Sequence, residues 1–344
     1  MEADRSRIGG DGRVTAAMNA APLRILMSPL AAQQTAAGLA AALGQRPHVI
    51  VGPDAIDADV AFVSRDVTGL STKQNVLPHT QAFHDAMRRA PSLRWVQAHS
   101  AGADRPVYGE LRARGVEVST ASGANASVVV QPALAGVLML ARQLPQLLAA
   151  QRSKTWAPLV GGRPPRDLAG QTAVVVGWGP IGQGLGALLA ALGLRVVAVR
   201  SSDGAASAPA VQSVRFEQIR EVLPQADWLL LACPLSERTR GLIDANALAL
   251  MPAGARLVNV SRGEVVDEPA LIATLQSGAL AGACLDVFAQ EPLPAASPLW
   301  EMPNVIVTPH TAGHSDGNEA RVAAIFLDNL QRLAQDRPLL YRVT

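Results

Sequence analysis

Three residues with different acid–base character lie in the C-terminal half of the chain, each in its own polar segment: Arg262, Glu291 and His310. Each segment comes at the end of an apolar run that is typical of a buried strand, at 255–260, 282–288 and 304–307. In an open parallel sheet, the ligand crevice lies outside the carboxyl ends of the strands. An arginine, a carboxylate and a histidine at that place can bind a carboxylate-bearing substrate and hold a proton. We therefore interpret the three as catalytic residues.

The three residue types suit a reaction on an organic acid. The planar guanidinium of Arg262 matches a carboxylate with two hydrogen bonds and can polarise a carbonyl oxygen. The imidazole of His310 can hold and release a proton near neutral pH, and a carboxylate beside an imidazole favours its protonated form. Each residue alone also fits a solvated structural role. Their occurrence together at three successive strand ends favours catalysis.

Length and composition indicate a globular protein of about two domains. Of the 344 residues, 49% are hydrophobic and 17% are charged, and the net charge of +2 gives no reason to expect nucleic acid as a partner. No apolar run reaches the roughly 18 residues that a membrane span needs. The first 22 residues lack the apolar core of a secretory signal, so we expect a loose N-terminal tail and a cytoplasmic protein. The two cysteines, Cys233 and Cys284, are expected to be buried and reduced, and the histidine spacing indicates no metal site.

Strand-like and helix-like segments alternate along the chain in two series, which predicts parallel sheets covered by helices. Strands of the first series are expected at 24–27, 48–51, 60–63, 93–97 and 116–118, with a helix around 82–89. Strands of the second series are expected at 174–176, 196–199, 228–232, 257–258, 283–287 and 305–307. A long helix is predicted from Asn125 towards Ala150, an irregular arm follows to Gly170, and a last helix covers 319–334.

A glycine-rich loop stands between the first strand of the second series and the helix that follows it. The candidate cofactor-binding residues of this loop are Gly177, Gly179, Pro180, Ile181 and Gly182. The glycines allow a tight turn and a close approach of the backbone to a pyrophosphate, and the helix start offers free N–H groups to it. Proline suits the first turn of a helix because its missing N–H is not needed there. The strand–loop–helix context makes this a predicted dinucleotide site.

The residues after the next strand predict which coenzyme binds. Arg200, Ser201 and Ser202 stand where an NAD site usually places an acidic residue for the ribose 2′-hydroxyl. An arginine there suits the 2′-phosphate of NADP, so we expect NADPH to be preferred, with NAD possible. The alternative is a solvated Arg200 with Asp203 binding the ribose.

With these motifs, the chain resembles the D-isomer-specific 2-hydroxyacid dehydrogenase family, most strongly from about Ser122 to Gly313. The resemblance implies two Rossmann-like or flavodoxin-like doubly wound α/β domains with an active-site cleft between them. Residues 23–122 with 315–344 would form the substrate domain, and 123–314 the NAD(P)-binding domain, after a tail at 1–22. It also implies a homodimer formed through the cofactor domain, to which the 151–170 arm could contribute.

The resemblance also implies roles for single residues. Arg262 would bind the 2-oxo-carboxylate, His310 would be the acid–base residue, and Glu291 would support it. The remaining candidates contact the cofactor or the substrate: Asp286 near the nicotinamide carboxamide, Cys233, Pro234 and Gly313 along the cofactor, and Ser100, Ala101 and Gly102 in the substrate loop. The roles of three further residues are open. Gln131 stands where relatives commonly carry Glu, His99 lies in the substrate loop, and His314 follows the catalytic segment.

The implied function is the NAD(P)H-dependent reduction of a small 2-oxo acid, of the glyoxylate or hydroxypyruvate kind, to a D-2-hydroxy acid, and the reverse reaction. One alternative is formate or phosphite oxidation in the same fold. Glu291 argues against formate, because formate-oxidising relatives place Gln beside the histidine. Another alternative is a nucleotide-sensing protein of the corepressor kind, which would bind the cofactor without turnover.

Overall fold

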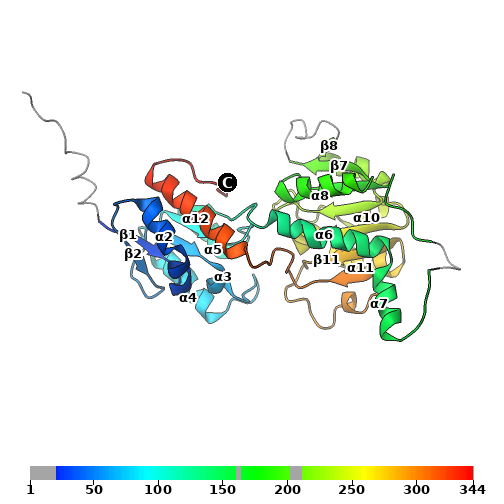
Figure 1. Cartoon of the computed structure of the whole chain (residues 1–344), viewed down its shortest axis with the longest axis horizontal. Helices are drawn as coiled ribbons and strands as arrows, with labels where there is room; N and C mark the ends of the chain where they lie inside the picture. Colours follow the sequence, from blue (N-terminus) through cyan, green and yellow to red (C-terminus); the bar gives the residue numbers. More distant parts are fainter. Residues whose placement is uncertain (1–20, 160–163, 202–210, 344) are drawn as a thin grey trace, which may run out of the picture. The chain divides into compact units, whose positions relative to one another are not determined.

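The computed structural model describes residues 21–159, 164–201 and 211–343. The N-terminal tail expected at 1–22 lies almost entirely outside the described residues, as do Ser202 and Asp203. The chain divides into two compact units, one made of Met1–Ser122 and Glu319–Thr344 and the other of Gly123–Asn318. Each unit is built around a parallel sheet with helices (Figure 1), which confirms the predicted fold class.

The first unit contains five parallel strands in the order β2-β1-β3-β4-β5. The strands are β1 (Leu23–Leu26), β2 (His48–Val51), β3 (Val60–Val63), β4 (Trp95–Ala98) and β5 (Glu117–Ser119). The helices are α2 (Pro29–Leu43), α3 (Arg65–Thr68), α4 (Pro78–Arg89), α5 (Pro106–Ala113) and α12 (Asn318–Ala334). Alternation along the strands buries both faces: Ala61 and Val63 pack with α4 and α5, whereas Phe62 faces the opposite side.

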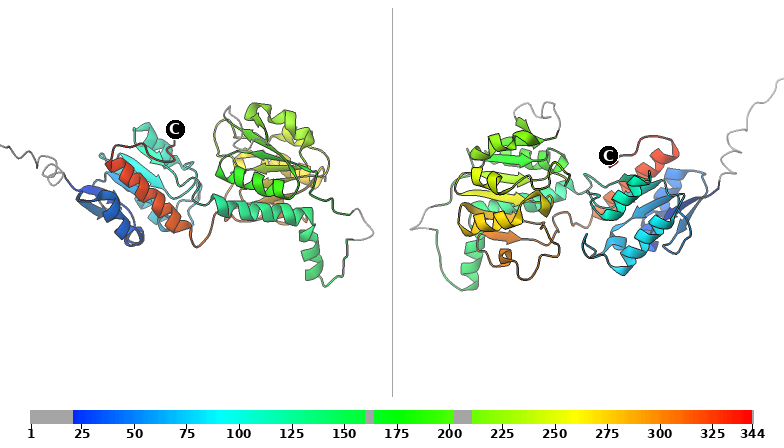
Figure 2. Two further views of the ribbon diagram at one scale, coloured as in Figure 1. Left: turned by 45° about the horizontal axis from the view of Figure 1, so that its top comes forward. Right: turned by 180° about the vertical axis from the view of Figure 1, so that it is seen from behind.

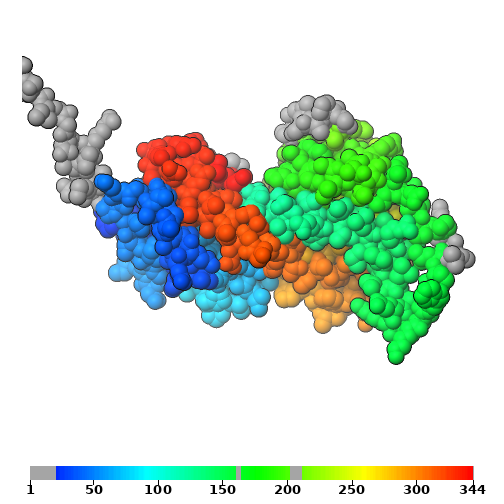
Figure 3. All heavy atoms as spheres, viewed as in Figure 1, coloured from blue at the N-terminus to red at the C-terminus, as the bar shows by residue number. Residues whose placement is uncertain are grey.

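Helix α12 completes this unit, although it comes from the far end of the chain. Phe326 is fully buried and stacks on Phe62 and Trp95, with ring centroids 4.4 and 5.6 Å apart. Helix α12 runs beside α2 (Figure 3), where Gly38 leaves room for Leu327. Beyond α12, the chain returns to the edge strand β5, where the Val343 N–H donates to the Val118 carbonyl at 2.8 Å.

The second unit contains seven parallel strands in the order β12-β11-β10-β9-β6-β7-β8. The strands are β6 (Thr172–Val176), β7 (Arg195–Arg200), β8 (Gln212–Arg215), β9 (Trp228–Leu231), β10 (Ala255–Asn259), β11 (Leu280–Leu285) and β12 (Val305–Val307). The α-helices are α6 (Ala126–Ala141), α7 (Leu144–Arg152), α8 (Pro180–Ala191), α9 (Ile219–Val222), α10 (Ala245–Leu250) and α11 (Glu268–Gln276). Short 3-10 turns are η1 (Phe216–Gln218), η2 (Leu223–Gln225), η3 (Gly263–Val265) and η4 (Pro298–Trp300).

Helices cover both faces of this sheet, which is why its inner strands are mostly apolar. Ala173 and Val175 of β6 pack with α6 and α8, whereas Val174 and Val176 pack with α9, α10 and α11. The strand order reverses between β6 and β9, because β7 and β8 extend the sheet to one side and β9 to β12 to the other. Ligands of such sheets bind at the carboxyl ends of the strands at this switch point.

Two features of the second unit differ from the prediction. The long helix expected from Asn125 to Ala150 is wrong, because α6 and α7 are separate and bent by 74° (Figure 2). The break comes at Gln143, whose φ of 55° is left-handed and stops the helical hydrogen-bond pattern. Strand β8 was not predicted, because this short polar strand lies at the edge of the sheet and its burial is partial.

Among the described residues, no single helix is both long and apolar enough to cross a membrane. Helices α6 and α7 meet the length and composition criteria only when they are taken together across their bend.

Candidate active site

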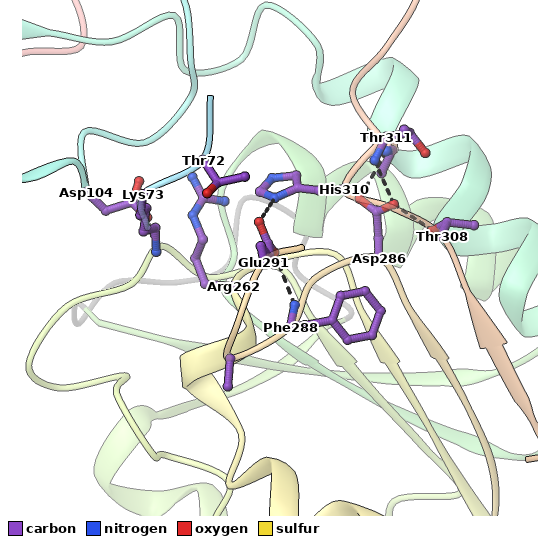
Figure 4. A network of polar contacts seen from close by, with 12 residues as sticks. Thr72, Lys73, Asp104, Arg262, Asp286, Phe288, Glu291, Thr308, His310 and Thr311 are labelled. Atoms are coloured by element: carbon purple, nitrogen blue, oxygen red, sulfur yellow. Dashed lines mark hydrogen bonds and ion pairs between the residues drawn. The ribbon is translucent and has the colours of Figure 1, made fainter. Parts of the chain in front are cut away.

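The three candidate catalytic residues follow three neighbouring strands of the second unit. Arg262 lies three residues after β10, Glu291 lies in the loop that follows β11, and His310 lies three residues after β12. Strands β10, β11 and β12 are adjacent and parallel, so their carboxyl ends share one edge of the sheet. The structure therefore brings the Arg262, Glu291 and His310 segments together, and Figure 4 shows their side chains side by side.

His310 and Glu291 form a hydrogen-bonded pair. The His310 Nδ1 lies 2.8 Å from the Glu291 Oε2, and the Glu291 Oε1 accepts a hydrogen bond from the Phe288 N–H at 3.1 Å. Partial burial raises the pKa of Glu291, but the His310 ring, the Phe288 N–H and the charge of Arg262 outweigh it and hold the pKa below its ordinary value. Glu291 is therefore an anion at neutral pH. Because Nδ1 is engaged, Nε2 is the His310 nitrogen that can exchange a proton with a ligand.

The His310 loop is held by Asp286, the first residue after β11. The buried Asp286 carboxylate accepts hydrogen bonds from the Thr308 hydroxyl (2.6 Å), the Thr311 N–H (2.9 Å) and the Ala312 N–H (3.0 Å). The His310 N–H also donates to the Asp286 carbonyl oxygen at 2.8 Å. His310 itself has a φ of 52°, which a non-glycine residue adopts only where its surroundings impose it. Asp286 supplies that constraint, and Figure 4 shows its carboxylate with Thr308 and Thr311.

Arg262 is anchored at the base of the same group. Its Nη1 donates to the Ser261 carbonyl oxygen at 2.7 Å, and its own carbonyl oxygen accepts a hydrogen bond from the Asn259 side chain at 3.1 Å. The next residue, Gly263, packs directly on the loop of Glu291. A Cβ added at Gly263 would lie 1.8 Å from the Phe288 carbonyl carbon, so only glycine lets the two loops meet.

The glycine loop occupies the switch point between β6 and β9. Gly177 has a φ of 97°, and an added Cβ would lie 2.6 Å from the Cys233 backbone. At Gly182 an added Cβ would lie 1.9 Å from the Gly177 carbonyl oxygen. Gly179, the N-cap of α8, has nothing within 4 Å of its Cβ position, so no protein atom of the described residues requires glycine there. A pyrophosphate against the backbone would require it, so the loop fits a dinucleotide.

The first turn of α8 supplies donors for that pyrophosphate. Pro180 occupies its first position, as predicted, and the backbone N–H groups of Ile181 and Gly182 belong to the turn whose donors have no partner inside the helix. The residues suited to hold the dinucleotide thus lie on the second unit. Arg200 is the last residue of β7, the strand next to β6, and Ser201 follows it at the surface.

The other cofactor candidates have structural contacts of their own. Cys233 is buried beside Gly177, and burial raises its thiol pKa to about 12, so it is no nucleophile. The Pro234 carbonyl oxygen accepts a hydrogen bond from the Thr239 hydroxyl at 2.7 Å. Gly313 lies against Asn125, whose Nδ2 would be 2.2 Å from an added Cβ. Both cysteines are free, Cys284 being buried as well.

The predicted substrate loop belongs to the first unit. Ser100, Ala101 and Gly102 follow β4, where the Ser100 hydroxyl donates to the Gly102 carbonyl oxygen at 2.6 Å. The Ser100 carbonyl oxygen accepts from the Ala121 N–H at 2.9 Å, so the loop is tied to the residues after β5. In the part of the chain that the structure describes, no group of histidine, cysteine or acidic residues is arranged to hold a metal ion.

Two residues of the site escaped the sequence reasoning in part. Asp286 was predicted only as a cofactor contact, whereas its hydrogen bonds hold the His310 loop. The hydroxyl of Thr308, two residues before His310, is one of the groups that bind it. Gly263 was not predicted to belong to the site, because nothing in the sequence shows which backbone lies opposite it.

Fold and site together define a class of protein. A doubly wound sheet with a dinucleotide loop at its switch point, and with an arginine and a histidine–carboxylate pair at neighbouring strand ends, is the arrangement of a nicotinamide-dependent dehydrogenase. The family model described as "D-isomer specific 2-hydroxyacid dehydrogenase, NAD binding domain" matches residues 134–312. The chain belongs to the D-isomer specific 2-hydroxyacid dehydrogenase family, as the resemblance predicted.

Known relatives agree with this assignment over most of the chain. An (S)-sulfolactate dehydrogenase of Chromohalobacter salexigens is 36% identical over 74% of this chain and 81% of its own length. A glyoxylate/hydroxypyruvate reductase B of Yersinia enterocolitica is 34% identical over 73% of this chain and 76% of its own length. A D-isomer specific 2-hydroxyacid dehydrogenase from Xanthobacter autotrophicus Py2, solved with NADPH and MES, is similar in structure, with a TM-score of 0.74 and 30% identity over 94% of this chain and 98% of that chain.

Proposed function

We propose that this dehydrogenase reduces a small 2-oxo acid, of the glyoxylate or hydroxypyruvate kind, to the D-2-hydroxy acid with NADPH as the preferred coenzyme, and catalyses the reverse reaction. The observation that carries the proposal is the His310–Glu291 pair, 2.8 Å apart, beside Arg262 at the carboxyl edge of the sheet. The substrate class is supported by the relative named glyoxylate/hydroxypyruvate reductase B. The relative named sulfolactate dehydrogenase makes sulfopyruvate a necessary comparison.

In this proposal the protein binds the acid and supplies a proton. Arg262 binds the substrate carboxylate through its planar fork and draws electron density from the carbonyl oxygen. The His310 Nε2 gives a proton to that oxygen during reduction and takes it back in the reverse direction. Glu291 stays ionised, fixes the ring through Nδ1 and stabilises its positive charge. Bound NADPH supplies the hydride.

The preference for NADPH rests on Arg200 at the end of β7. A guanidinium at this position forms charge-assisted hydrogen bonds with a 2′-phosphate, and the Ser201 hydroxyl can add a donor. The related structure from Xanthobacter autotrophicus was solved with NADPH, which supports the same choice. Arg200→Asp should lower kcat/KM for NADPH through like-charge repulsion and raise it for NADH. A wild-type enzyme that favours NADH would contradict this part of the proposal.

The test of the reaction is a reduction screen with both coenzymes. Glyoxylate, hydroxypyruvate, pyruvate, phenylpyruvate, oxaloacetate and sulfopyruvate should be compared by kcat/KM, and the first two should give the largest values. Arg262→Lys keeps the charge but loses the fork, so it should lower kcat/KM at least tenfold, which is about 1.4 kcal/mol of transition-state binding. Tight NADPH binding without turnover of any 2-oxo acid would instead favour the nucleotide-sensing alternative.

We also propose that the protein forms a homodimer through the cofactor unit. Exposed apolar side chains gather on α7 and the segment after it: Leu144 is 37%, Leu148 42% and Trp156 93% exposed. Such a group is unusual for a surface that faces only water. Light scattering should give the mass of a dimer, and Trp156→Ala with Leu148→Asp should give that of a monomer.

A further inference from the structure

Two arginines stand next to each other at the edge of the second unit's sheet. Strand β8 pairs with β7 in parallel, and the last pair in register is Arg200 with Arg215. Neighbouring strands lie about 4.8 Å apart, so the two Cα atoms are close. Both residues end their strands, β7 and β8 (Figure 1), so both lie at the carboxyl edge of the sheet. Strand β6 runs parallel to β7, so the glycine loop that follows β6 lies at the same edge.

The pleat of the sheet places both side chains on one face. Val199 and Val214, the preceding pair in register, pack together in the core on the face of α9, α10 and α11. Successive side chains alternate between faces, so Arg200 and Arg215 belong to the opposite face. That face is the one covered by α8, whose Leu185 and Leu189 pack against it. Arg215 is thus on the same side of the sheet as the dinucleotide helix.

The residues that follow β8 bring further charged groups close to Arg215. The nearby carboxylate of Glu217 is paired with Arg238, whose guanidinium also lies 5.7 Å from the centre of the Phe216 ring. The Glu217 backbone N–H, the pairing with Arg238 and the charge of Arg215 all lower the pKa of Glu217, so Arg215 lies close enough to act on this carboxylate. A phosphate monoester carries a charge of about −1.5 to −2 at pH 7, which guanidinium groups bind through charge-assisted hydrogen bonds.

We propose that Arg215 is a second guanidinium of the site for the adenosine 2′-phosphate, acting together with Arg200. This inference rests on the proposed preference for NADPH and adds a residue that the sequence did not single out. Two arginines on neighbouring strands can bind different oxygens of one phosphate, whereas Arg200 alone leaves one side of the group to water. The 2′-hydroxyl of NADH has no charge to bind, so Arg215 contributes to discrimination and not to binding in general.

Two competitive ligands that differ only in the 2′-phosphate test the inference: adenosine 2′,5′-bisphosphate and adenosine 5′-monophosphate. Their inhibition constants against NADPH should be measured for the wild type, Arg215→Gln, Arg215→Lys and the control Arg220→Gln. Arg220 is an exposed arginine on the following helix, paired with Asp244, so its loss changes the net charge equally. Arg215→Gln should weaken the bisphosphate at least tenfold and the monophosphate less than twofold. Arg215→Lys should be intermediate, and the control should change neither ligand.

The outcomes separate this inference from the proposed coenzyme preference. If the wild type binds the bisphosphate no better than the monophosphate, the NADPH preference fails, and the role of Arg215 fails with it. If the wild type favours the bisphosphate and Arg215→Gln keeps that preference, the inference alone is overturned. Equal weakening of both ligands by Arg215→Gln also overturns it, because the effect would then be structural. The ratio of kcat/KM for NADPH and NADH should change in parallel with the ratio of the two inhibition constants.

Discussion

Replacing Asp286 with asparagine tests whether this residue positions His310. The carboxylate accepts three hydrogen bonds from the His310 loop, and an amide keeps only one acceptor oxygen. The amide NH₂ of Asp286→Asn must therefore face a donor, either the Ala312 N–H or the Thr308 and Thr311 groups. A hydrogen bond to a charged group contributes about 1.5–3 kcal/mol, so the loop conformation should lose about 2 kcal/mol or more. At about 1.4 kcal/mol per factor of ten, kcat should fall roughly 30-fold.

The assay is the steady-state reduction of the best 2-oxo acid, with the coenzyme dissociation constant measured separately by titration. Asp286→Asn should lower kcat while coenzyme binding changes little. Thr308→Val is the matched control: it removes only the 2.6 Å hydroxyl bond and keeps the charge, so its effect should be smaller. A variant whose kcat stays within twofold of the wild type, with a weakened coenzyme affinity, would show that Asp286 serves the cofactor and not the His310 loop.

Three further predictions concern other residues. Glu291→Gln should lower kcat/KM for reduction, because a neutral amide no longer stabilises the charged His310 ring that donates the proton; an unchanged kcat/KM contradicts the pairing. Gly263→Ala should lower both kcat/KM and the melting temperature, since its Cβ would force the Phe288 backbone away at a cost of about 1–3 kcal/mol; wild-type values would refute this contact. His84→Leu should flatten the acid side of the stability curve. Burial lowers the pKa of His84 from 6.5 to about 4. As the pH falls, this histidine is therefore protonated in the unfolded chain at a higher pH than in the folded protein. The free energy of unfolding should decrease by about 3 kcal/mol between pH 6.5 and pH 4. Urea unfolding of both proteins at pH 7.5 and 4.5 measures the difference, and equal losses would exclude the mechanism.

Buried elements of the fold could be predicted from the sequence because their chemistry is local. Apolar runs such as Val174–Val176 have no alternative to a strand that is covered on both faces, and the structure extends this one to Thr172–Val176. The edge strand β8 could not be predicted, because it contains one apolar residue and depends on its pairing with β7. The break between α6 and α7 was missed although Pro145, in the first turn of α7, is a local signal for the start of a new helix. Gln143 itself carries no helix-stopping side chain, and its left-handed backbone is seen only in the structure.

The site was predictable in its residue types and not in its contacts. Arg262, Glu291 and His310 stand out because strand ends are where polar groups meet in a parallel sheet. That Asp286 ties down the His310 loop, or that Gly263 touches the Phe288 carbonyl, depends on backbone paths that only three-dimensional structure gives. Arg215 belongs to the same category, because its partner Arg200 is distant in sequence and adjacent only by strand register.

The stacking of Phe326 on Phe62 and Trp95 has a consequence for the order in which the protein is made. The first unit cannot close its core until α12 has been synthesised, whereas the second unit is one continuous stretch of chain. About 200 residues separate the two parts of the first unit, which at roughly 5–20 residues per second is a delay of about 10–40 s on the ribosome. During that interval Phe62 and Trp95 lack their stacking partner Phe326, whereas the whole chain of the cofactor unit is already present before α12 is complete.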